Sequence, residues 1–265
     1  MTIPFTKAHG ARNDFLLTWC KDAPEGGRAA VARAICDRHT GVGADGWLLI
    51  EQETGGEADA AIQLYNSDGS TAELSGNGTR CAAAFLAEQA PRPVESVRIR
   101  TGAGVKVLRL LERAGRVFRF EMNMGRPEIQ RSRFDLPLST GPCDVTLVWV
   151  GNPQCAVPVV DFAFDWRAVG AEIERHQQFP RRTNVSFVKP VDGHTIEVRF
   201  FERGAGETMS SGTGSTGAAV AAVARGMAAS PVRVITPAGP IDLRLDDEVY
   251  LTGPAEIVAE GRFFL

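Results

Sequence analysis

Two short segments of the chain combine serine and glycine in a pattern that suits chemistry at a carboxylate. They are residues 75–78 (SGNG) and 211–214 (SGTG), and an alanine-rich stretch typical of a helix follows each one. Glycines at a helix start let backbone N–H groups face a ligand, and the helix N-terminus adds partial positive charge. Serine is also a preferred helix cap, so one copy alone would indicate little. Two copies favour a site that binds one carboxylate between them.

Such a site would place Ser75 and Ser211 on opposite faces of the carbon that bears the carboxylate. Removing a proton from one face and returning one to the other inverts this carbon, which requires two groups of suitable pKa. Cysteine, with an ordinary pKa of about 8.5, suits this role, whereas serine needs a strong helper. Ser211 follows Glu202 by nine residues, as Ser75 follows Asn66. A loop of that length can bring Glu202 near Ser211, but Asn66 cannot act as a base, so we expect unequal faces.

The elements that carry these segments repeat in the two halves of the chain. Each half runs from a predicted strand, 60–65 or 195–201, through the glycine-rich segment into a predicted helix, 79–89 or 215–225. Residues 82–87 are apolar almost all round, which indicates a central, buried helix. Further strands are predicted at 97–100, 105–111, 117–122, 145–150, 232–235 and 241–245. The sequence predicts an α+β fold with two pseudo-symmetric halves, each a mostly antiparallel sheet or barrel wrapped on a buried central helix.

Composition narrows the classes of function. The chain has 29 Lys and Arg against 32 Asp and Glu, so no basic surplus favours binding to nucleic acid. No apolar run approaches the roughly 20 residues of a membrane helix, and the N-terminus lacks the apolar core of a signal peptide. The five cysteines are scattered, odd in number and form no C-x-x-C pair, and nothing pairs His9 or His39 at metal-ligand spacing. We therefore expect a cytoplasmic protein with a small-molecule partner, no metal, no nucleic acid and no membrane.

Six blocks of the sequence, in this order, resemble the diaminopimelate epimerase family. They are residues 9–15 (HGARNDF), 37–45 (DRHTGVGAD), 66–70 (NSDGS), 75–81 (SGNGTRC), 151–155 (GNPQC) and 202–208 (ERGAGET). The resemblance implies an active site in a cleft between two pseudo-symmetric halves, with no pyridoxal phosphate or other cofactor. It implies inversion of one α-carbon of LL-2,6-diaminopimelate to the meso form, in the synthesis of lysine and peptidoglycan precursors.

The resemblance also implies a homodimer and a final strand that folds back onto the first half. A polar, glycine-containing stretch at 112–116 marks the expected boundary. We expect a first half of residues 1–115 with a C-terminal strand at about 256–265, and a second half of residues 116–255.

Carried over residue by residue, the resemblance keeps the substrate contacts. Asn66, Asn184 and Arg203 would hold the distal carboxylate, which suits the planar fork of an arginine. Backbone donors at the two helix starts would hold the reacting carboxylate. The full set of implied substrate-binding residues is Asn13, Asn66, Gly76, Asn77, Asn152, Asn184, Glu202, Arg203, Gly212 and Thr213.

At the positions that the resemblance implies to be catalytic, this chain has residue types different from those of the family. Its two catalytic cysteines fall on Ser75 and Ser211, which with Glu202 are the candidate catalytic residues. The histidine of its Gly-Asn-Pro-His block is Gln154, and a glutamine that contacts substrate falls on Gly46. Serines introduced to trap a substrate would explain neither of these last two changes, which favours natural divergence.

Three readings of the activity remain open from the sequence. The first is a cofactor-independent epimerase that acts on diaminopimelate by transfer of the α-proton. The second is a divergent or inactive member that runs one-base chemistry at the α-carbon, such as loss of a β-substituent. The third is a protein that only binds a diamino-dicarboxylate. Uptake of solvent deuterium at the α-carbon separates an enzyme from a binder.

Overall fold

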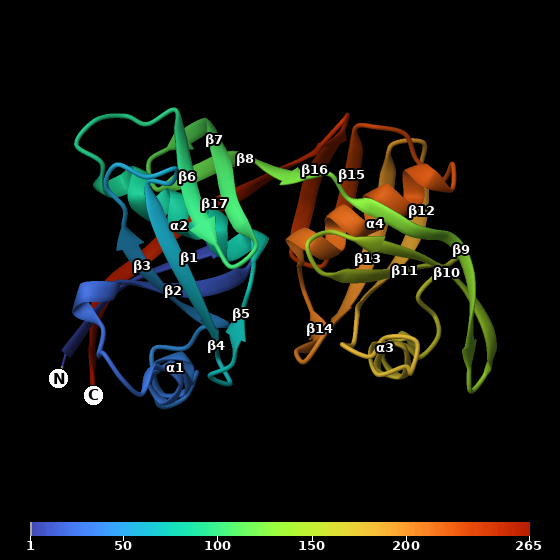
Figure 1. The fold of residues 1–265 in the computed structure, drawn as a ribbon, viewed down its shortest axis with the longest axis horizontal. Helices are drawn as coiled ribbons and strands as arrows, with labels where there is room; N and C mark the ends of the chain where they lie inside the picture. The colour runs from blue at the N-terminus through green and yellow to red at the C-terminus, as the bar shows by residue number, and fades with distance from the viewer. Residues whose placement is uncertain (1) are drawn as a thin grey trace. The chain divides into compact units, whose positions relative to one another are not determined.

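Residues 2–265 are described by a computed structural model, in which the chain separates into two compact units. The first unit comprises Met1–Met122 with Gly253–Leu265, and the second comprises Asn123–Thr252. Strand β17 (Val249–Phe264) contributes residues to both units. Each unit combines a curved, mostly antiparallel sheet with one buried helix and one peripheral helix, as Figure 1 shows for each unit by itself.

The first unit is built on the buried helix α2 (Gly76–Gln89). Its other elements are β1 (Thr2–Gly10), β2 (Asn13–Trp19), the short 3₁₀ helix η1 (Cys20–Asp22), α1 (Arg28–Cys36), β3 (Gly46–Gln52), β4 (Ala60–Asn66), β5 (Thr71–Ala72), β6 (Ser96–Thr101), β7 (Gly104–Ala114) and most of β8 (Val117–Gly125). Neighbouring strands run antiparallel except for the parallel pairs β2–β3 and β4–β6. Ala82, Ala83 and Ala84 have no exposed surface, so the strands pack closely around α2.

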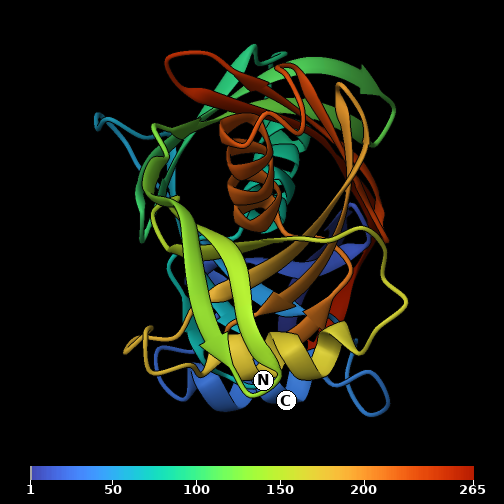
Figure 2. The ribbon, with the colours of Figure 1, turned by 90° about the vertical axis from the view of Figure 1, so that its right-hand side faces the viewer.

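The second unit repeats this plan around α4 (Gly212–Ala224), which its strands enclose in Figure 2. Its other elements are β9 (Glu128–Leu138), β10 (Gly141–Trp149), β11 (Pro153–Pro158), α3 (Trp166–Glu174), β12 (Asn184–Asp192), β13 (Thr195–Glu202), β14 (Gly206–Thr208), β15 (Val232–Thr236) and β16 (Gly239–Leu245). Here the parallel pairs are β11–β12 and β13–β15. Two parallel pairs in an otherwise antiparallel sheet thus occur in each unit.

The two buried helices confirm the predicted fold class, but both begin earlier than the predicted 79–89 and 215–225. The glycine-rich residues form the first turn of each helix, because Ser75 and Ser211 act as N-caps. Helices α1 and α3 were not predicted. Both are short, and α1 buries Val31, Ala32, Ile35 and Cys36 on a single face.

The C-terminal strand returns to the N-terminal strand of the first unit. Strand β17 pairs antiparallel with β1 from Thr2 opposite Phe264 to His9 opposite Glu256. No helix in residues 2–265 is long and apolar enough to cross a membrane. In the same part of the chain, no group of three or more His, Cys, Asp or Glu side chains is arranged to hold a metal ion.

Candidate functional site

In the second unit, the strand–loop–helix connection brings Glu202 to Ser211. Strand β13 ends at Glu202, and β14 pairs back against it, with Glu202 opposite Gly206. The hydroxyl of Ser211 donates to Glu202 Oε1 over 2.6 Å, and the hydroxyl of Thr208 donates to Oε2 over 2.8 Å. The predicted approach of Glu202 to Ser211 is confirmed. Thr208, which the sequence reasoning did not select, lies at the end of the block at residues 202–208.

This carboxyl group is set up to accept a proton from the serine. Burial raises the pKa of Glu202, while the hydrogen bonds from Ser211 and Thr208 act in the opposite direction. Ser211 Oγ also accepts from Gly214 N over 3.1 Å, so its own proton is directed to the carboxylate. A hydroxyl between a partly buried carboxylate and a helix N-terminus is the arrangement that activates a weak acid.

The corresponding serine of the first unit has a different environment. Ser75 Oγ accepts from Gly78 N over 3.0 Å, which is the cap of α2. Among the described residues no carboxylate hydrogen-bonds to Ser75. The side chain of Asn66 donates instead to Ser70 Oγ over 3.0 Å, within the turn after β4. The predicted inequality between the two serines is therefore present in their immediate partners.

The backbone donors predicted at the helix starts are the first residues of each helix. They are Gly76 and Asn77 in α2, and Gly212 and Thr213 in α4. The first intrahelical backbone bonds reach back from Thr79 N to Ser75 O and from Ser215 N to Ser211 O. The N–H groups of Gly78 and Gly214 bond the serine caps, and those of the first two residues of each helix point out of its N-terminus, in the orientation that suits an anion.

The loop that carries Arg203 is held by two side chains. Arg203 N donates to Asn184 Oδ1 over 3.0 Å, and Asn184 Nδ2 donates to Pro153 O over 3.1 Å. Gly204 N donates to Glu174 Oε1 over 3.2 Å. The guanidinium of Arg203 is exposed and bonds the carbonyl of Arg181. The structure thus brings Asn184 and Arg203 together, but it uses the Asn184 amide to position the loop.

Asn152 and Thr213 meet at the start of α4. Asn152 Nδ2 lies 3.4 Å from Thr213 Oγ1, and Gln154 Nε2 donates to Asn152 Oδ1 over 2.7 Å. Gln154 is buried, and its Oε1 has no partner in the described part of the chain. The glutamine that replaces the family's histidine therefore supports Asn152.

Asn13 and Asn77 meet in the first unit, next to a charged cluster. Asn77 Nδ2 donates to Asn13 Oδ1 over 3.3 Å, and Asn13 Nδ2 donates to Asp45 Oδ2 over 2.7 Å. Arg38 bonds both Asp45 and Asp14. Burial alone would raise the pKa of Asp14, but hydrogen bonds and charges from Arg38 and Lys7 outweigh it and lower the pKa. Sequence reasoning did not select Arg38 or Asp45, although both lie in the block at residues 37–45.

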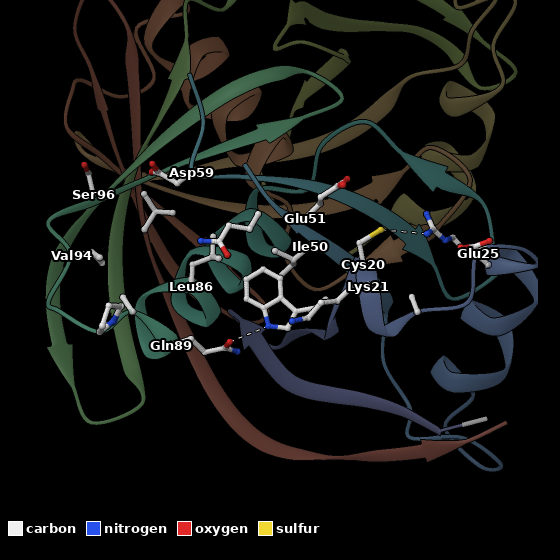
Figure 3. A pocket seen from close by; sticks show the side chains of 17 residues that line it. Cys20, Lys21, Glu25, Ile50, Glu51, Asp59, Leu86, Gln89, Val94 and Ser96 are labelled. Carbon is white, nitrogen blue, oxygen red and sulfur yellow. Dashed lines mark hydrogen bonds between the residues drawn. The ribbon is translucent and has the colours of Figure 1, made fainter. Parts of the chain in front are cut away.

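A separate cavity of about 960 Å³ lies in the first unit. Figure 3 shows Leu86 and Gln89 beside it, with Gln89 accepting a hydrogen bond from the Trp19 indole over 3.1 Å. These two residues belong to the C-terminal end of α2, whereas Ser75 is at its N-terminus. None of the predicted site residues lines this cavity. The cavity is therefore distinct from the serine site.

Comparisons with known proteins identify the family. The family model described as diaminopimelate epimerase matches residues 5–130 and 146–258. A diaminopimelate epimerase of Pelotomaculum thermopropionicum is 40% identical over 277 residues, which cover 98% of each chain. One of an Azoarcus species is 38% identical over 282 residues, which cover 100% of each chain.

Solved structures of the same fold have low sequence identity to the chain. A hydroxyproline epimerase from Agrobacterium vitis superposes with a TM-score of 0.76 at 15% identity, covering 98% of this chain and 92% of that one. A phenazine biosynthesis protein of the PhzF family from Bacillus anthracis gives 0.73 at 14% identity, covering 100% of each chain. These likenesses show the α+β fold, and the full-length matches above show the family. The chain belongs to the diaminopimelate epimerase family.

Proposed function

We propose that the protein is a cofactor-independent isomerase that converts LL-2,6-diaminopimelate to the meso form. The observation that carries this proposal is the hydroxyl of Ser211, held between the carboxyl of Glu202 and the N-terminus of α4. The family membership supports the choice of substrate, because curated relatives named diaminopimelate epimerase match the chain over almost its whole length. The product serves the synthesis of lysine and of peptidoglycan precursors.

The proposed reaction begins on the face of the α-carbon served by Ser211. The α-C–H bond breaks, its proton moves to Ser211 Oγ, and the hydroxyl proton of Ser211 moves to Glu202. The electron pair left on the α-carbon spreads into the carboxylate, where backbone N–H groups at the helix starts stabilise the added charge. Ser75 then donates its proton to the opposite face, and a C–H bond of inverted configuration forms. This step requires both helix starts to meet one substrate. Solvent afterwards returns a proton to Ser75 and takes one from Glu202, which completes the turnover.

The Ser75 face is the weaker one in this scheme. After donation its oxygen carries negative charge, and the groups that support it are Gly78 N and the N-terminus of α2. On the Ser211 face, by contrast, the carboxylate of Glu202 can take up the proton. We therefore propose that protonation and deprotonation at Ser75 limit the rate.

Arg203 is proposed to hold the distal carboxylate of the substrate. Its exposed guanidinium projects from a loop whose backbone is fixed by Asn184 and Glu174. A fixed loop lowers the ordering cost of binding, and a planar fork matches a carboxylate. Asn66 would contribute from the first unit.

Incubation of LL- and meso-diaminopimelate with the protein in heavy water tests the function. We expect interconversion of the two isomers together with deuterium at the α-carbon, both visible by NMR. Deuterium uptake without inversion would show that the protein runs one-base chemistry at the α-carbon and is not an epimerase. Saturable binding with neither change would reduce the protein to a binder of diamino-dicarboxylates.

We further propose that the protein acts as a cytoplasmic homodimer. The dimer is implied by the family resemblance, and the five cysteines are all free, as is common for proteins of reducing compartments. Light scattering on the purified protein measures the assembly. A mass of one chain at working concentration would refute the dimer.

A further inference from the structure

A row of four polar side chains crosses the first unit, and every hydrogen bond in it runs in the same direction. The row consists of Arg80, Asn77, Asn13 and Asp45, and we call it the amide row. Arg80 donates to Asn77 Oδ1, Asn77 donates to Asn13 Oδ1, and Asn13 donates to Asp45 Oδ2. Its members come from α2, from β2 and from the residue before β3. The row therefore depends on the folded unit.

Arg80 is an unusual residue with which to begin such a row. Its side chain has no exposed surface, and burial lowers its pKa to about 10, so it remains a cation at neutral pH. Its bonds go to neutral acceptors, Asn77 Oδ1 and the carbonyl of Pro254 at 3.2 Å. Its Nη1 has no partner in the described chain. A buried cation without a carboxylate partner is costly to stability, and this calls for an explanation.

The chemistry of the two ends determines how the two amides between them must point. A guanidinium can only donate, so it requires the oxygen of Asn77 to face it. The nitrogen of Asn77 is then turned to Asn13, whose oxygen must accept. The carboxylate of Asp45 at the far end only accepts, and it is held by Arg38 Nη2 at 2.8 Å. Reversing either amide would place donor against donor at one end and acceptor against acceptor at the other.

This orientation has a consequence for ligand recognition. The nitrogen of Asn13 carries two N–H bonds, and one goes to Asp45. The other has no acceptor in residues 2–265, and the side chain is partly exposed. A flipped Asn13 would present an oxygen there and repel a carboxylate.

We infer that Arg80 and Asp45 are positioning residues. They fix the direction in which the two amides of the amide row point, so that Asn13 presents an N–H donor to a carboxylate of the substrate. This inference rests on the proposed function, because it takes Asn13 as a substrate-binding residue. Arg80 and Asp45 act from opposite ends, and neither needs to touch the substrate.

Substitutions of Arg80 separate positioning from packing. Lysine also only donates and keeps the direction of the row, so Arg80→Lys should keep the KM for diaminopimelate within about threefold of the parent. Arg80→Gln can donate or accept, and Arg80→Met does neither. Both should raise KM roughly tenfold or more, with a smaller effect on kcat, because the Asn13 donor is no longer fixed. Arg80→Met should also unfold at a Tm no lower than the parent's, because it removes a buried charge.

Arg225 offers a matched control in the second unit. Its side chain is almost fully buried and bonds both oxygens of Asp144, at 2.6 and 2.8 Å. Arg225→Met should lower the Tm and leave KM unchanged. If Arg80 were purely structural, KM would stay unchanged in Arg80→Met and Arg80→Gln, as it should in Arg225→Met. If the direction of the amide row did not matter, KM would rise as much in Arg80→Lys as in Arg80→Met. Either outcome would overturn the inference.

Neutron diffraction on the parent protein tests the amide row without any substrate. Deuterons should lie on the nitrogen of Asn77 toward Asn13 and on the nitrogen of Asn13 toward Asp45. The opposite orientation of either amide rejects the inference, whatever the activity proves to be. A parent that neither binds nor converts diaminopimelate would reject the proposed function, while the neutron map would still decide how the amides point.

Discussion

The two serines differ in the group that can take their proton. Ser211 donates to Glu202 over 2.6 Å, whereas Ser75 Oγ accepts from Gly78 N as a helix cap. Serine is a much weaker acid than cysteine, so a carboxylate partner matters more for serine than for a thiol. At the scale of single residues, the chain therefore supports one face of its proposed reaction better than the other.

Restoring thiols should raise the activity. We expect the double variant Ser75→Cys with Ser211→Cys to convert LL- to meso-diaminopimelate roughly 100-fold faster than the parent, because a thiol near a helix N-terminus ionises readily. Each single variant should gain much less, and Ser75→Cys should gain more than Ser211→Cys, because Ser75 has no base. The conversion rate and α-deuterium uptake measure this. A double variant that folds and binds diaminopimelate without faster conversion would contradict it.

Glu202 should impose a pH limit on activity. Burial raises its pKa, so the carboxylate that accepts a proton from Ser211 forms only above that raised pKa, and the rate should fall as the pH drops through it. Glu202→Gln should lose roughly 10²–10⁴-fold in rate and lose this acidic limb. A pH–rate profile measures both effects, and an unchanged acidic limb in Glu202→Gln would assign it to another group.

The same pKa shift predicts an effect on stability. The folded protein keeps the Glu202 proton to a higher pH than the unfolded chain, so stability should fall as the pH rises from the ordinary pKa of about 4.3 through the raised one. Glutamine does not ionise, so Glu202→Gln should be more stable than the parent above that range. Urea titrations at several pH values would show this. Equal free energies of unfolding for the parent and Glu202→Gln at every pH would contradict the conclusion that burial raises the pKa of Glu202.

Arg203 should contribute directly to substrate affinity. Arg203→Ala should weaken the binding of diaminopimelate by about 1.5–3 kcal/mol, the range for a hydrogen bond to a charged group. Arg203→Lys should recover only part of this, because the planar fork is lost. Calorimetry measures the affinity, with Arg181→Ala as the neighbouring control, since Arg181 contacts Arg203 through its backbone carbonyl. Unchanged affinity in Arg203→Ala would exclude Arg203 from the site.

At the scale of elements, Ser75 and Ser211 each cap a helix as well as standing at a proposed catalytic position, and Ser75 allows the two roles to be separated. Ser75→Ala should lower the free energy of unfolding by about 1 kcal/mol, because Gly78 N loses its capping acceptor. Ser75→Asn should restore the cap and the stability without restoring conversion. Urea unfolding and the conversion assay together separate the two roles. A Ser75→Asn protein as active as the parent would show that Ser75 acts only as a cap.

At the scale of the whole molecule, the C-terminal strand is expected to complete the first half of residues 1–115. Deleting residues 256–265 would remove the partner of β1 from Thr2 to His9. We expect faster amide hydrogen exchange throughout the first unit, because the backbone of β1 loses its ladder on that side. Asn123–Thr252 should keep its protection. Equal exchange in the first unit of the truncated and full chains would argue against this role.

Much of the fold and the site was available from the amino-acid sequence because it rests on local or repeated signals. The paired serine–glycine segments predict two capped helices, and the apolar surface of residues 82–87 predicts burial. The spacing between Glu202 and Ser211 predicts their approach, which the 2.6 Å bond confirms. The six blocks identify the family. These signals can be read from the sequence because caps, turns and hairpins involve residues that are close together along the chain.

The tertiary structure decided which polar groups bond each other across the chain. It placed the amide of Asn184 against the backbone of Arg203 and Pro153, and it buried Arg80 beneath a carbonyl of the C-terminal strand. Arg80 and Pro254 are far apart in sequence, so no local pattern reports their contact. Such contacts depend on strand register, in which a shift of one residue reverses the direction of every side chain. They therefore emerge only when the sheets have closed around their helices.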